Sequence, residues 1–387
     1  MTNDPTPRTV VTLAVIAGVA VSTLYFCQPI LTLIDRSFPG TGTSVPTATF
    51  AGYAVGIMLL VPLGDRVARR WLIAGQLGLL ALVSLAMALA SSAGIMLAAS
   101  FAIGVFATAA QQAVPLAAEL APDGVRGRVI GNVMTGLLLG ILLARTVSGV
   151  VGAEYGWRPV FAGASVACGV LAVVALRLPG RAPVQKLGYG ALLLSLLVLI
   201  RRHPLLRRAA LQQGLLFGAF SLFWVTLVLL LEEPRYGLGP REAGLFGVLG
   251  AVGALVPPLA GRIADRRGPA VVARVGTMLV LAGFTLFWLL GERTLWGLGA
   301  GVLVMDVGIQ ITLIANQAQI YALDPAARGR LNTVFVTGIF AGGTLGSMAG
   351  TLAWSAGGWG AVCAAGVGAA LLAILVSRSR PAVVGGA

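Results

Sequence analysis

Long apolar segments recur along this chain at nearly regular intervals, and they constrain its fold more than any other feature. Each is roughly twenty residues long, the length that a helix needs to cross about 30 Å of membrane hydrocarbon. The chain is 58% apolar and 10% charged, with a mean hydropathy of +0.93, whereas soluble domains are about 45–50% apolar and about 25% charged. The sequence therefore predicts an all-α polytopic membrane protein in a lipid bilayer. Its twelve predicted transmembrane helices lie near residues 9–34, 44–63, 71–91, 94–119, 129–152, 157–178, 208–231, 241–261, 270–290, 294–320, 331–354 and 358–377.

The positive charges indicate how these helices are oriented. Of the 27 Lys and Arg residues, 21 fall on one side of the predicted membrane, five on the other and one, Arg145, inside a span. Cytoplasmic loops carry such an excess, so we expect both termini in the cytoplasm. All of these cations except Lys186 are arginine, and the chain is rich in Ala and Gly, which indicates a bacterial protein and hence the bacterial inner membrane. The net charge of +14 is spread between apolar segments, so we expect no nucleic-acid partner.

The longest predicted cytoplasmic segment, residues 179–207, separates six spans from six. Its apolar part, residues 190–200, predicts an amphipathic helix on the membrane surface. We expect an N-terminal six-helix bundle over residues 1–178, a C-terminal one over residues 208–387, and a monomer. The three cysteines, Cys27, Cys168 and Cys363, lack the spacing of a metal site, so we expect packing thiols and no metal.

The two halves are copies of each other. Leu63–Arg66 after the second span corresponds to Ile263–Arg266 after the eighth, at an offset of 200 residues. Gly156-Trp157 before the sixth span corresponds to Gly358-Trp359 before the twelfth, at an offset of 202. Because each half has an even number of spans, the copies insert in the same orientation. This symmetry is one of those from which alternating-access transporters are built.

Small residues repeat in the same way. Every fourth residue is small in the fifth span, at Gly136, Gly140, Ala144, Ser148 and Gly152, and in the eleventh, at Gly338, Gly342, Gly346 and Gly350. Residues four apart lie on one face of a helix, so each span predicts a groove for close helix approach. Packing alone explains any single one of them, whereas the matched register in both halves indicates a shared architecture.

The loop after the second span resembles a motif of the major facilitator superfamily, the twelve-helix secondary transporters. The motif reads G-x-L-A-D-R-x-G-R-R, and Val61–Arg70 keeps the Asp and the three arginines while replacing both glycines. The second copy, Gly261–Gly268, keeps both glycines. The resemblance covers essentially the whole chain and implies two six-helix bundles that rock about a central path.

The resemblance also implies a gate. In the family the loop Asp faces the N-terminal end of the eleventh helix, near Leu331 here, where the helix dipole favours an anion. We further expect Arg70 to pair with Glu119 at the inner end of the fourth span. The predicted gating residues are Asp65, Arg66, Arg70, Glu119, Asp265 and Arg266. The alternative is that the arginines only set the topology and that the Asp only forms a turn.

The fifth span is similar to the motif G-x8-G-x3-G-P-x2-G-G of drug/proton antiporters. Gly131, Gly140 and Ser148-Gly149 keep the spacing, but Ala144-Arg145 stands where the family has Gly-Pro. This departure removes the usual kink and places a charge in the membrane. In appearance the chain is closest to bacterial drug/proton antiporter-like efflux proteins.

Two charges lie clearly inside predicted spans, Arg145 in the fifth and Asp306 in the tenth. A charge at this depth costs about 2.5–3.5 kcal/mol on insertion scales and is therefore a candidate functional residue. Asp306 is our candidate for carrying a proton or binding a cation, because protonation and substrate binding can compete at a buried carboxylate. The alternative is a static Asp306–Arg145 pair that only locks helices together.

In the family, helices one, four, seven and ten line the transport cavity. The polar and aromatic residues on the matching spans are Tyr25, Gln28, Gln111, Gln112, Gln213, Phe220, Trp224, Gln310, Asn316 and Gln317. Each alone is also explained as contact between helices. Together with Asp306 and Arg145 they predict a pocket for a small cationic, zwitterionic (such as an amino acid) or amphipathic molecule.

We therefore predict a secondary active transporter that exports a small organic solute, driven by the proton motive force and without a bound cofactor. A sugar or metabolite importer, or a facilitator, is the alternative, and a non-transporting membrane receptor is a remote one. The lone histidine, His203, has no catalytic partner nearby, and no hydrolase or nucleotide-binding motif occurs in the sequence. We do not expect an enzyme.

Overall fold

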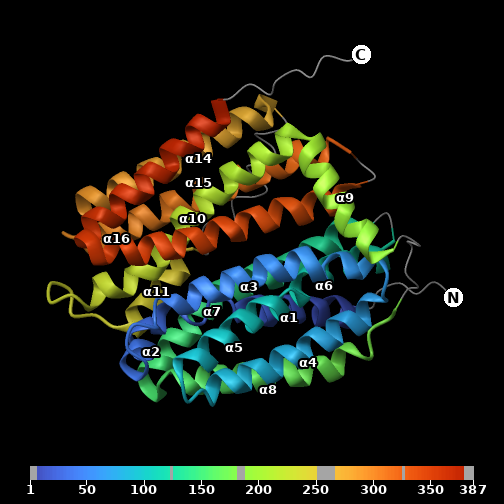
Figure 1. Ribbon diagram of the computed structural model, residues 1–387, viewed down its shortest axis with the longest axis horizontal. Helices are drawn as coiled ribbons and strands as arrows, with labels where there is room; N and C mark the ends of the chain where they lie inside the picture. Colours follow the sequence, from blue (N-terminus) through green and yellow to red (C-terminus); the bar gives the residue numbers. More distant parts are fainter. Residues whose placement is uncertain (1–6, 123–124, 181–187, 251–265, 325–326, 379–387) are drawn as a thin grey trace. The chain divides into compact units, whose positions relative to one another are not determined.

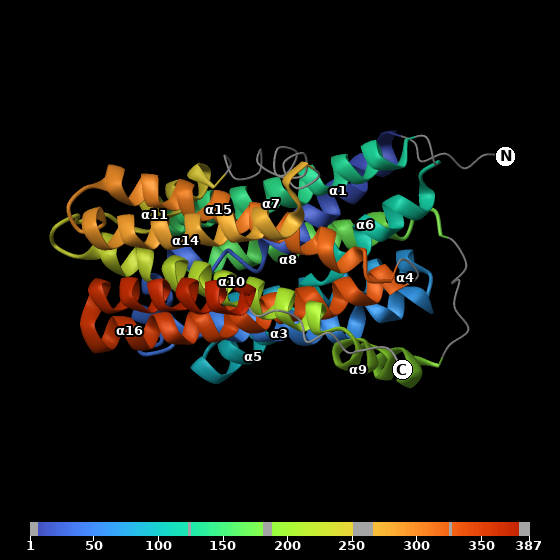
Figure 2. The ribbon, with the colours of Figure 1, turned by 90° about the horizontal axis from the view of Figure 1, so that it is seen from above.

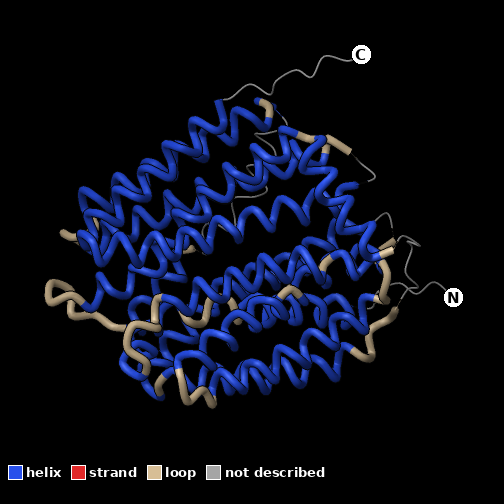
Figure 3. The backbone as a smooth tube through the Cα atoms, viewed as in Figure 1, coloured by secondary structure: helices blue, strands red, loops and turns tan. Residues whose placement is uncertain are grey.

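The computed structural model describes residues 7–122, 125–180, 188–250, 266–324 and 327–378. Throughout these residues the secondary structure is helix joined by turns and loops, without a strand (Figure 3). Nine of the helices described are long and apolar enough to cross a membrane. Large apolar side chains such as Leu82 and Leu352 point outward from them, as expected where lipid is the solvent. The predicted all-α membrane fold is confirmed.

Contacts along the chain divide it into two compact units. Met1–Tyr189 and Leu227–Val248 form the first, and Gly190–Thr226 and Leu249–Ala387 form the second. This grouping places a short part of the C-terminal half with the first unit, unlike the predicted division at residues 178 and 208.

In the described part of the first half, ten helical elements follow one another, and Figure 1 labels the α-helices among them. They are α1 (Pro7–Ser22), η1 (Gln28–Ile30), α2 (Leu31–Ser37), α3 (Ser44–Leu60), η2 (Pro62–Asp65), α4 (Arg69–Ala88), α5 (Ala93–Ala107), α6 (Ala109–Leu120), α7 (Arg126–Tyr155) and α8 (Trp157–Ala175).

The later helices among the described residues are α9 (Tyr189–Arg202), α10 (Pro204–Glu232), α11 (Pro240–Leu249), α14 (Pro269–Leu290), α15 (Leu295–Tyr321) and α16 (Arg328–Arg378). Together the described helices correspond to all twelve predicted spans, although α11 covers only the first half of the eighth.

The first predicted span is broken at membrane depth. Helix α1 ends at Ser22, a turn follows, and the chain resumes as η1 and α2. The turn is closed by short-range bonds, including one from the Gln28 backbone N–H to the Tyr25 carbonyl at 3.2 Å. Irregular backbone at this depth is tolerated only where protein buries it or a cavity hydrates it, and Leu24, Tyr25 and Cys27 are all buried. The fourth span is similarly interrupted at Thr108, between α5 and α6.

The repeated small residues pack two pairs of helices closely together. A side chain at Gly140 of α7 would collide with the backbone of Gly18 in α1, and one at Gly342 of α16 would collide with Gly214 in α10. Figure 2 shows α1 beside α7 and α10 beside α16. The predicted groove is confirmed in both halves, and the helix that fills it is the first span of the same half.

The repeated Gly-Trp pairs also have equivalent roles. Gly156 and Gly358 both adopt positive φ, 82° and 57°, a region that glycine enters at little cost. The tryptophan after each is buried. Trp157 donates its indole N–H to Ser37 Oγ at 3.0 Å, and Trp359 donates to the Phe287 carbonyl at 3.0 Å. The turn at Gly357 and Gly358 divides α16 into the predicted eleventh and twelfth spans.

Helix α9 lies where the amphipathic segment is predicted. Leu192, Leu196 and Leu199 form its buried stripe, whereas Leu194 and Leu197 are exposed. The helix itself is confirmed, and its position on the membrane surface stays a prediction.

Candidate transport and gating sites

Arg145 forms a cluster with the break in the first span. Its Nε donates to Gln28 Oε1 at 2.7 Å, and its guanidinium carbon lies 4.6 Å from the centre of the Tyr25 ring. Its Nη1 donates to the Ile141 carbonyl at 3.3 Å. Arg145 is 3% exposed and Gln28 is 1% exposed. A cation over an aromatic face is stabilised by the ring quadrupole, the more so when desolvated, so this buried charge has a favourable environment.

Helix α11 covers the aliphatic part of Arg145. A side chain at Gly247 would lie 3.0 Å from Arg145 Cβ, and one at Gly244 would lie 2.5 Å from the Arg145 carbonyl oxygen. The hydroxyl of Thr146 also donates to the Gly244 carbonyl at 3.2 Å. The absence of side chains on this face of α11 therefore lets it pack directly against α7.

The other predicted cavity residues of the first half separate into two places. Gln111 donates to the Tyr53 hydroxyl at 3.0 Å, inside the predicted second and fourth spans. Gln112 instead donates to the Leu60 carbonyl at 2.9 Å and accepts a bond from Arg69. The structure thus joins Gln112 to the loop motif, although it is predicted as a cavity residue.

Arg69 is the centre of the loop motif. It donates through Nε to Glu119 Oε1 at 2.6 Å, through Nη1 to Gln112 Oε1 at 2.7 Å and through Nη2 to Asp65 Oδ1 at 3.0 Å. The prediction that Arg70 pairs with Glu119 is therefore wrong, because the adjacent arginine occupies that position. Asp65 and Arg69 are four residues apart, but a non-helical segment at Ala68 separates η2 from α4, so their pairing does not follow from helical spacing in the sequence.

Two of the remaining predicted gating residues, Arg66 and Arg70, make none of the hydrogen bonds of this cluster. The Arg70 guanidinium stacks 4.9 Å from the centre of the Trp71 ring. Arg66 and Arg266 are exposed. Asp265 lies outside the described residues.

In the second unit, Asp306 lies in the middle of α15. It is 8% exposed and eleven residues from Leu295, where the helix begins, which corresponds to about 16 Å along the helix axis. Arg145 belongs to the first unit, and the pairing of these two charges stays a prediction.

Two predicted residues of the second unit bond to each other. Asn316 donates to Gln213 Oε1 at 3.4 Å, and Gln213 donates to the Ile309 carbonyl at 3.4 Å. These bonds connect α10 to α15, and both amides are buried. Gln310 and Gln317 are half-buried on α15.

The predicted aromatic residues of α10 form part of a larger cluster. Phe220 stacks on Phe217 with ring centres 5.2 Å apart and lies 6.0 Å from Trp224. Trp224 in turn contacts Phe223, which stacks on Phe287 at 4.3 Å. Rings packed in this way stabilise contacts between helices. Such packing is the alternative to a role in solute binding that the sequence leaves open for each of these residues.

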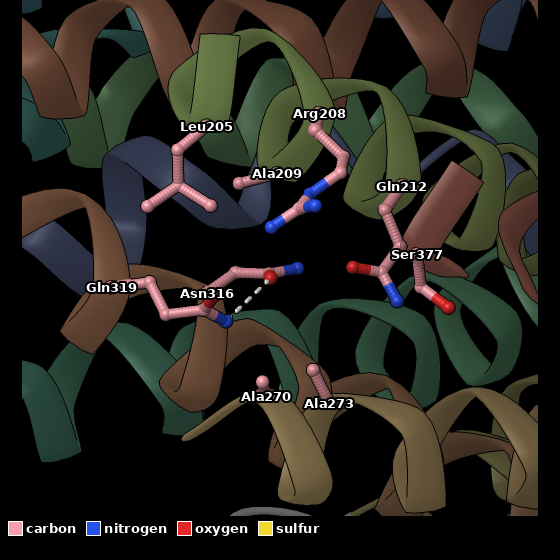
Figure 4. A pocket seen from close by; sticks show the side chains of 9 residues that line it. All are labelled: Leu205, Arg208, Ala209, Gln212, Ala270, Ala273, Asn316, Gln319 and Ser377. Carbon is pink, nitrogen blue, oxygen red and sulfur yellow. Dashed lines mark hydrogen bonds between the residues drawn. The ribbon is translucent and has the colours of Figure 1, made fainter. Parts of the chain in front are cut away.

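A small cavity lies near the predicted cytoplasmic ends of α10, α14, α15 and α16. Figure 4 shows the head groups of Arg208, Gln212 and Asn316 turned toward a common space, with Asn316 bonded to Gln319 at 3.5 Å. Leu205, Ala209, Ala270, Ala273 and Ser377 complete its lining. Its volume of about 20 Å³ is sufficient for a water molecule but not for an organic solute.

Glu232, at the end of α10, makes a contact that the sequence did not indicate. The hydroxyl of Thr32 donates to Glu232 Oε1 at 2.6 Å, and Arg36 Nη2 lies 3.7 Å from Glu232 Oε2. The contact ties α2 to α10 at the ends predicted to face outward. Because it joins residues 200 apart in two different spans, no local pattern could have revealed it.

Known proteins resemble this chain along most of its length. Residues 10–346 match the Major Facilitator Superfamily. The uncharacterised transporter YgaY of Escherichia coli O157:H7 is 39% identical over 378 residues, which are 97% of this chain and 96% of that protein. A chloramphenicol efflux pump of Mycobacterium tuberculosis is 27% identical over 251 residues, covering 60% of this chain and 58% of the pump. Among solved structures, a variant of the nucleoside transporter NupG has a TM-score of 0.74 at 14% identity, covering 95% of this chain and 98% of that one.

Apolar helices that bury polar and charged side chains at membrane depth, in two matching halves, define a multi-pass membrane transporter. The expected resemblance is confirmed, and the chain belongs to the Major Facilitator Superfamily. It is accordingly a transporter and not an enzyme.

Proposed function

We propose that the chain exports a small organic solute across the bacterial inner membrane in exchange for protons, by alternating access. The observation that carries this proposal is the buried Asp306 carboxylate in the middle of α15. A carboxylate at this depth is costly while ionised. It can therefore lose its charge by taking a proton when a compensating group or solute leaves.

The direction of transport and the chemical kind of the solute are inferred from different observations. The spacing of the antiporter motif is kept around Arg145, apart from the Gly-Pro pair, and relatives include chloramphenicol efflux pumps. The half-buried rings of Phe217 and Phe220 on α10 and the half-buried amides of Gln310 and Gln317 on α15 suit a molecule with both apolar and hydrogen-bonding parts. A drug-like or metabolite-like amphipathic solute fits these features.

Flux in proteoliposomes tests the proposal. The purified chain is reconstituted, a pH gradient is imposed, and the movement of radiolabelled chloramphenicol is followed. We expect accumulation against its concentration gradient in the wild type and loss of that accumulation in Asp306→Asn, which keeps the side-chain shape but cannot ionise. Glu154→Gln, an exposed carboxylate of α7, is the matched control and should transport normally.

Two results would contradict the proposal. If Asp306→Asn accumulates the probe as well as the wild type does, this carboxylate does not couple transport to protons. If the wild type moves the probe equally with and without a pH gradient, the chain is a facilitator, the alternative that the sequence leaves open.

A further inference from the structure

We propose that Arg145, Gln28 and Tyr25 form a subsite for the carboxylate of a small organic acid or zwitterion. The proposal rests on the transport function above and concerns solutes that carry a carboxylate. Chloramphenicol, the probe of the flux experiment, has no carboxylate and would not use this subsite. These three side chains come from α7 and from the break in the first span, and all belong to one compact unit.

The hydrogen bond between Arg145 and Gln28 fixes the orientation of the amide. Because Arg145 Nε–H needs an acceptor, Gln28 presents its oxygen to the guanidinium, at 2.7 Å. The Nε2 group of Gln28 therefore faces elsewhere, and it has no hydrogen-bond partner among the described residues although it is buried. Buried polar groups in native proteins are nearly always bonded, so an amide donor in this state indicates a missing acceptor.

The groups that meet here are mostly hydrogen-bond donors. A guanidinium has five N–H donors and no acceptor, and a side-chain amide nitrogen has two donors, while Tyr25 presents the face of its ring to Arg145. An arginine also stays ionised in proteins, so Arg145 brings a positive charge to the subsite. A carboxylate accepts several bonds at once and pairs with a guanidinium in a bidentate manner. An ammonium group would be repelled by Arg145 and could bond to few atoms.

The backbone supports the same assignment. Discontinuous transmembrane helices mark substrate sites in many transporters, and the turn between Ser22 and Gln28 places both Tyr25 and Gln28 at such a break. Arg145 lies seven residues from residue 152, where the predicted fifth span ends, or about 10 Å along the axis. The subsite is therefore within the predicted span rather than at the membrane surface.

A competing explanation is that the cluster only locks α7 to the broken span. The substitution Gln28→Glu separates the two explanations. It places a carboxylate of the protein itself beside Arg145, which would strengthen a lock but occupy a binding site. We expect this variant to be at least as stable to heat as the wild type and to lose affinity for acids.

Ligand binding to purified protein tests the subsite. Two matched pairs of probes are used, benzoate with benzamide and N-acetylphenylalanine with N-acetylphenylalaninamide, and each is titrated while the thermal midpoint is recorded. We expect the acids to raise the midpoint of the wild type and the amides to leave it unchanged. Arg145→Gln and Gln28→Glu should each weaken acid binding at least tenfold, whereas Arg128→Gln, an exposed arginine of the same helix, should not.

Three outcomes would overturn the assignment. They are the absence of acid binding to the wild type, equal binding of acids and amides, and acid binding that survives in both Arg145→Gln and Gln28→Glu. Because Gln28→Glu preserves the size of the side chain, a folding failure of Arg145→Gln would not prevent the test. The assay uses no membrane or pH gradient, so failure of proton-coupled export in the flux experiment leaves its result readable, and the reverse also holds.

Discussion

Replacement of Arg69 by alanine should destabilise the first unit far more than replacement of its neighbour Arg70. Arg69 makes three side-chain hydrogen bonds, to Glu119, Gln112 and Asp65. Arg70 stacks on Trp71, which is 52% exposed. The two substitutions remove the same atoms from adjacent positions. The difference between their free energies of unfolding therefore reports only the different surroundings of the two side chains.

The cost can be worked from the burial of each partner. Gln112 is fully buried, and leaving its oxygen without a donor costs about 1–3 kcal/mol. Asp65 and Glu119 have side chains 34% and 36% exposed, so water replaces part of what they lose, and each pair contributes about 0.2–1 kcal/mol. We expect a total loss of about 2–4 kcal/mol for Arg69→Ala. The contact of the half-buried Arg70 with the exposed Trp71 ring is worth about 0.5–1 kcal/mol.

Heating followed by fluorescence-detected size-exclusion chromatography measures the difference. For a unit of this size about 1 kcal/mol shifts the midpoint by 2–4 °C, so Arg69→Ala should fall roughly 5–15 °C below the wild type and Arg70→Ala only slightly. The reasoning is refuted if the two variants have equal midpoints, or if Arg70→Ala has the lower one.

Two further predictions concern helix contacts. Gly140→Ala places a methyl group against the backbone of α1 and should lower the free energy of unfolding by about 1–3 kcal/mol. The control, Gly163→Ala, adds a methyl group where the structure leaves open space and should be neutral in the same heating assay. Equal midpoints for the two variants would contradict the close approach of α1 and α7. Glu232→Gln weakens the contact with α2 and should speed hydrogen–deuterium exchange in α2. The control, Glu233→Gln, affects a pair with Arg235 instead and should leave that exchange unchanged. If Glu232→Gln also leaves it unchanged, the contact does not hold α2 to the end of α10.

The sequence alone was sufficient for the membrane-embedded helical fold. Apolar length and the scarcity of charge limit the chain to helices in lipid, and these properties can be counted without knowing any contact. The register of Gly140 and Gly342 also predicted close packing correctly, because residues four apart lie on one face of any helix. Helix partners were not predictable in this way, since a smooth face fits several neighbours.

The candidate sites depended on the tertiary structure much more. The sequence singled out Arg145 and Gln28 as polar residues within spans, but they are 117 positions apart. Their hydrogen bond requires the break after Ser22, and it requires the face of α7 that carries Arg145 to be turned toward that break. Hydrophobic periodicity marks a helix without showing where its backbone bonds stop, so the break itself was not visible.

The choice between Arg69 and Arg70 shows the same limit. Both arginines fit the loop motif, and they point about 100° apart around a helix. Only the packing of α4 against α6 decides which one reaches Glu119. Composition and spacing thus determined the solvent, the spans and the duplication of this protein, because those follow from free energies summed over many residues. Its individual polar contacts were decided by the tertiary structure, because each depends on the position of a few atoms.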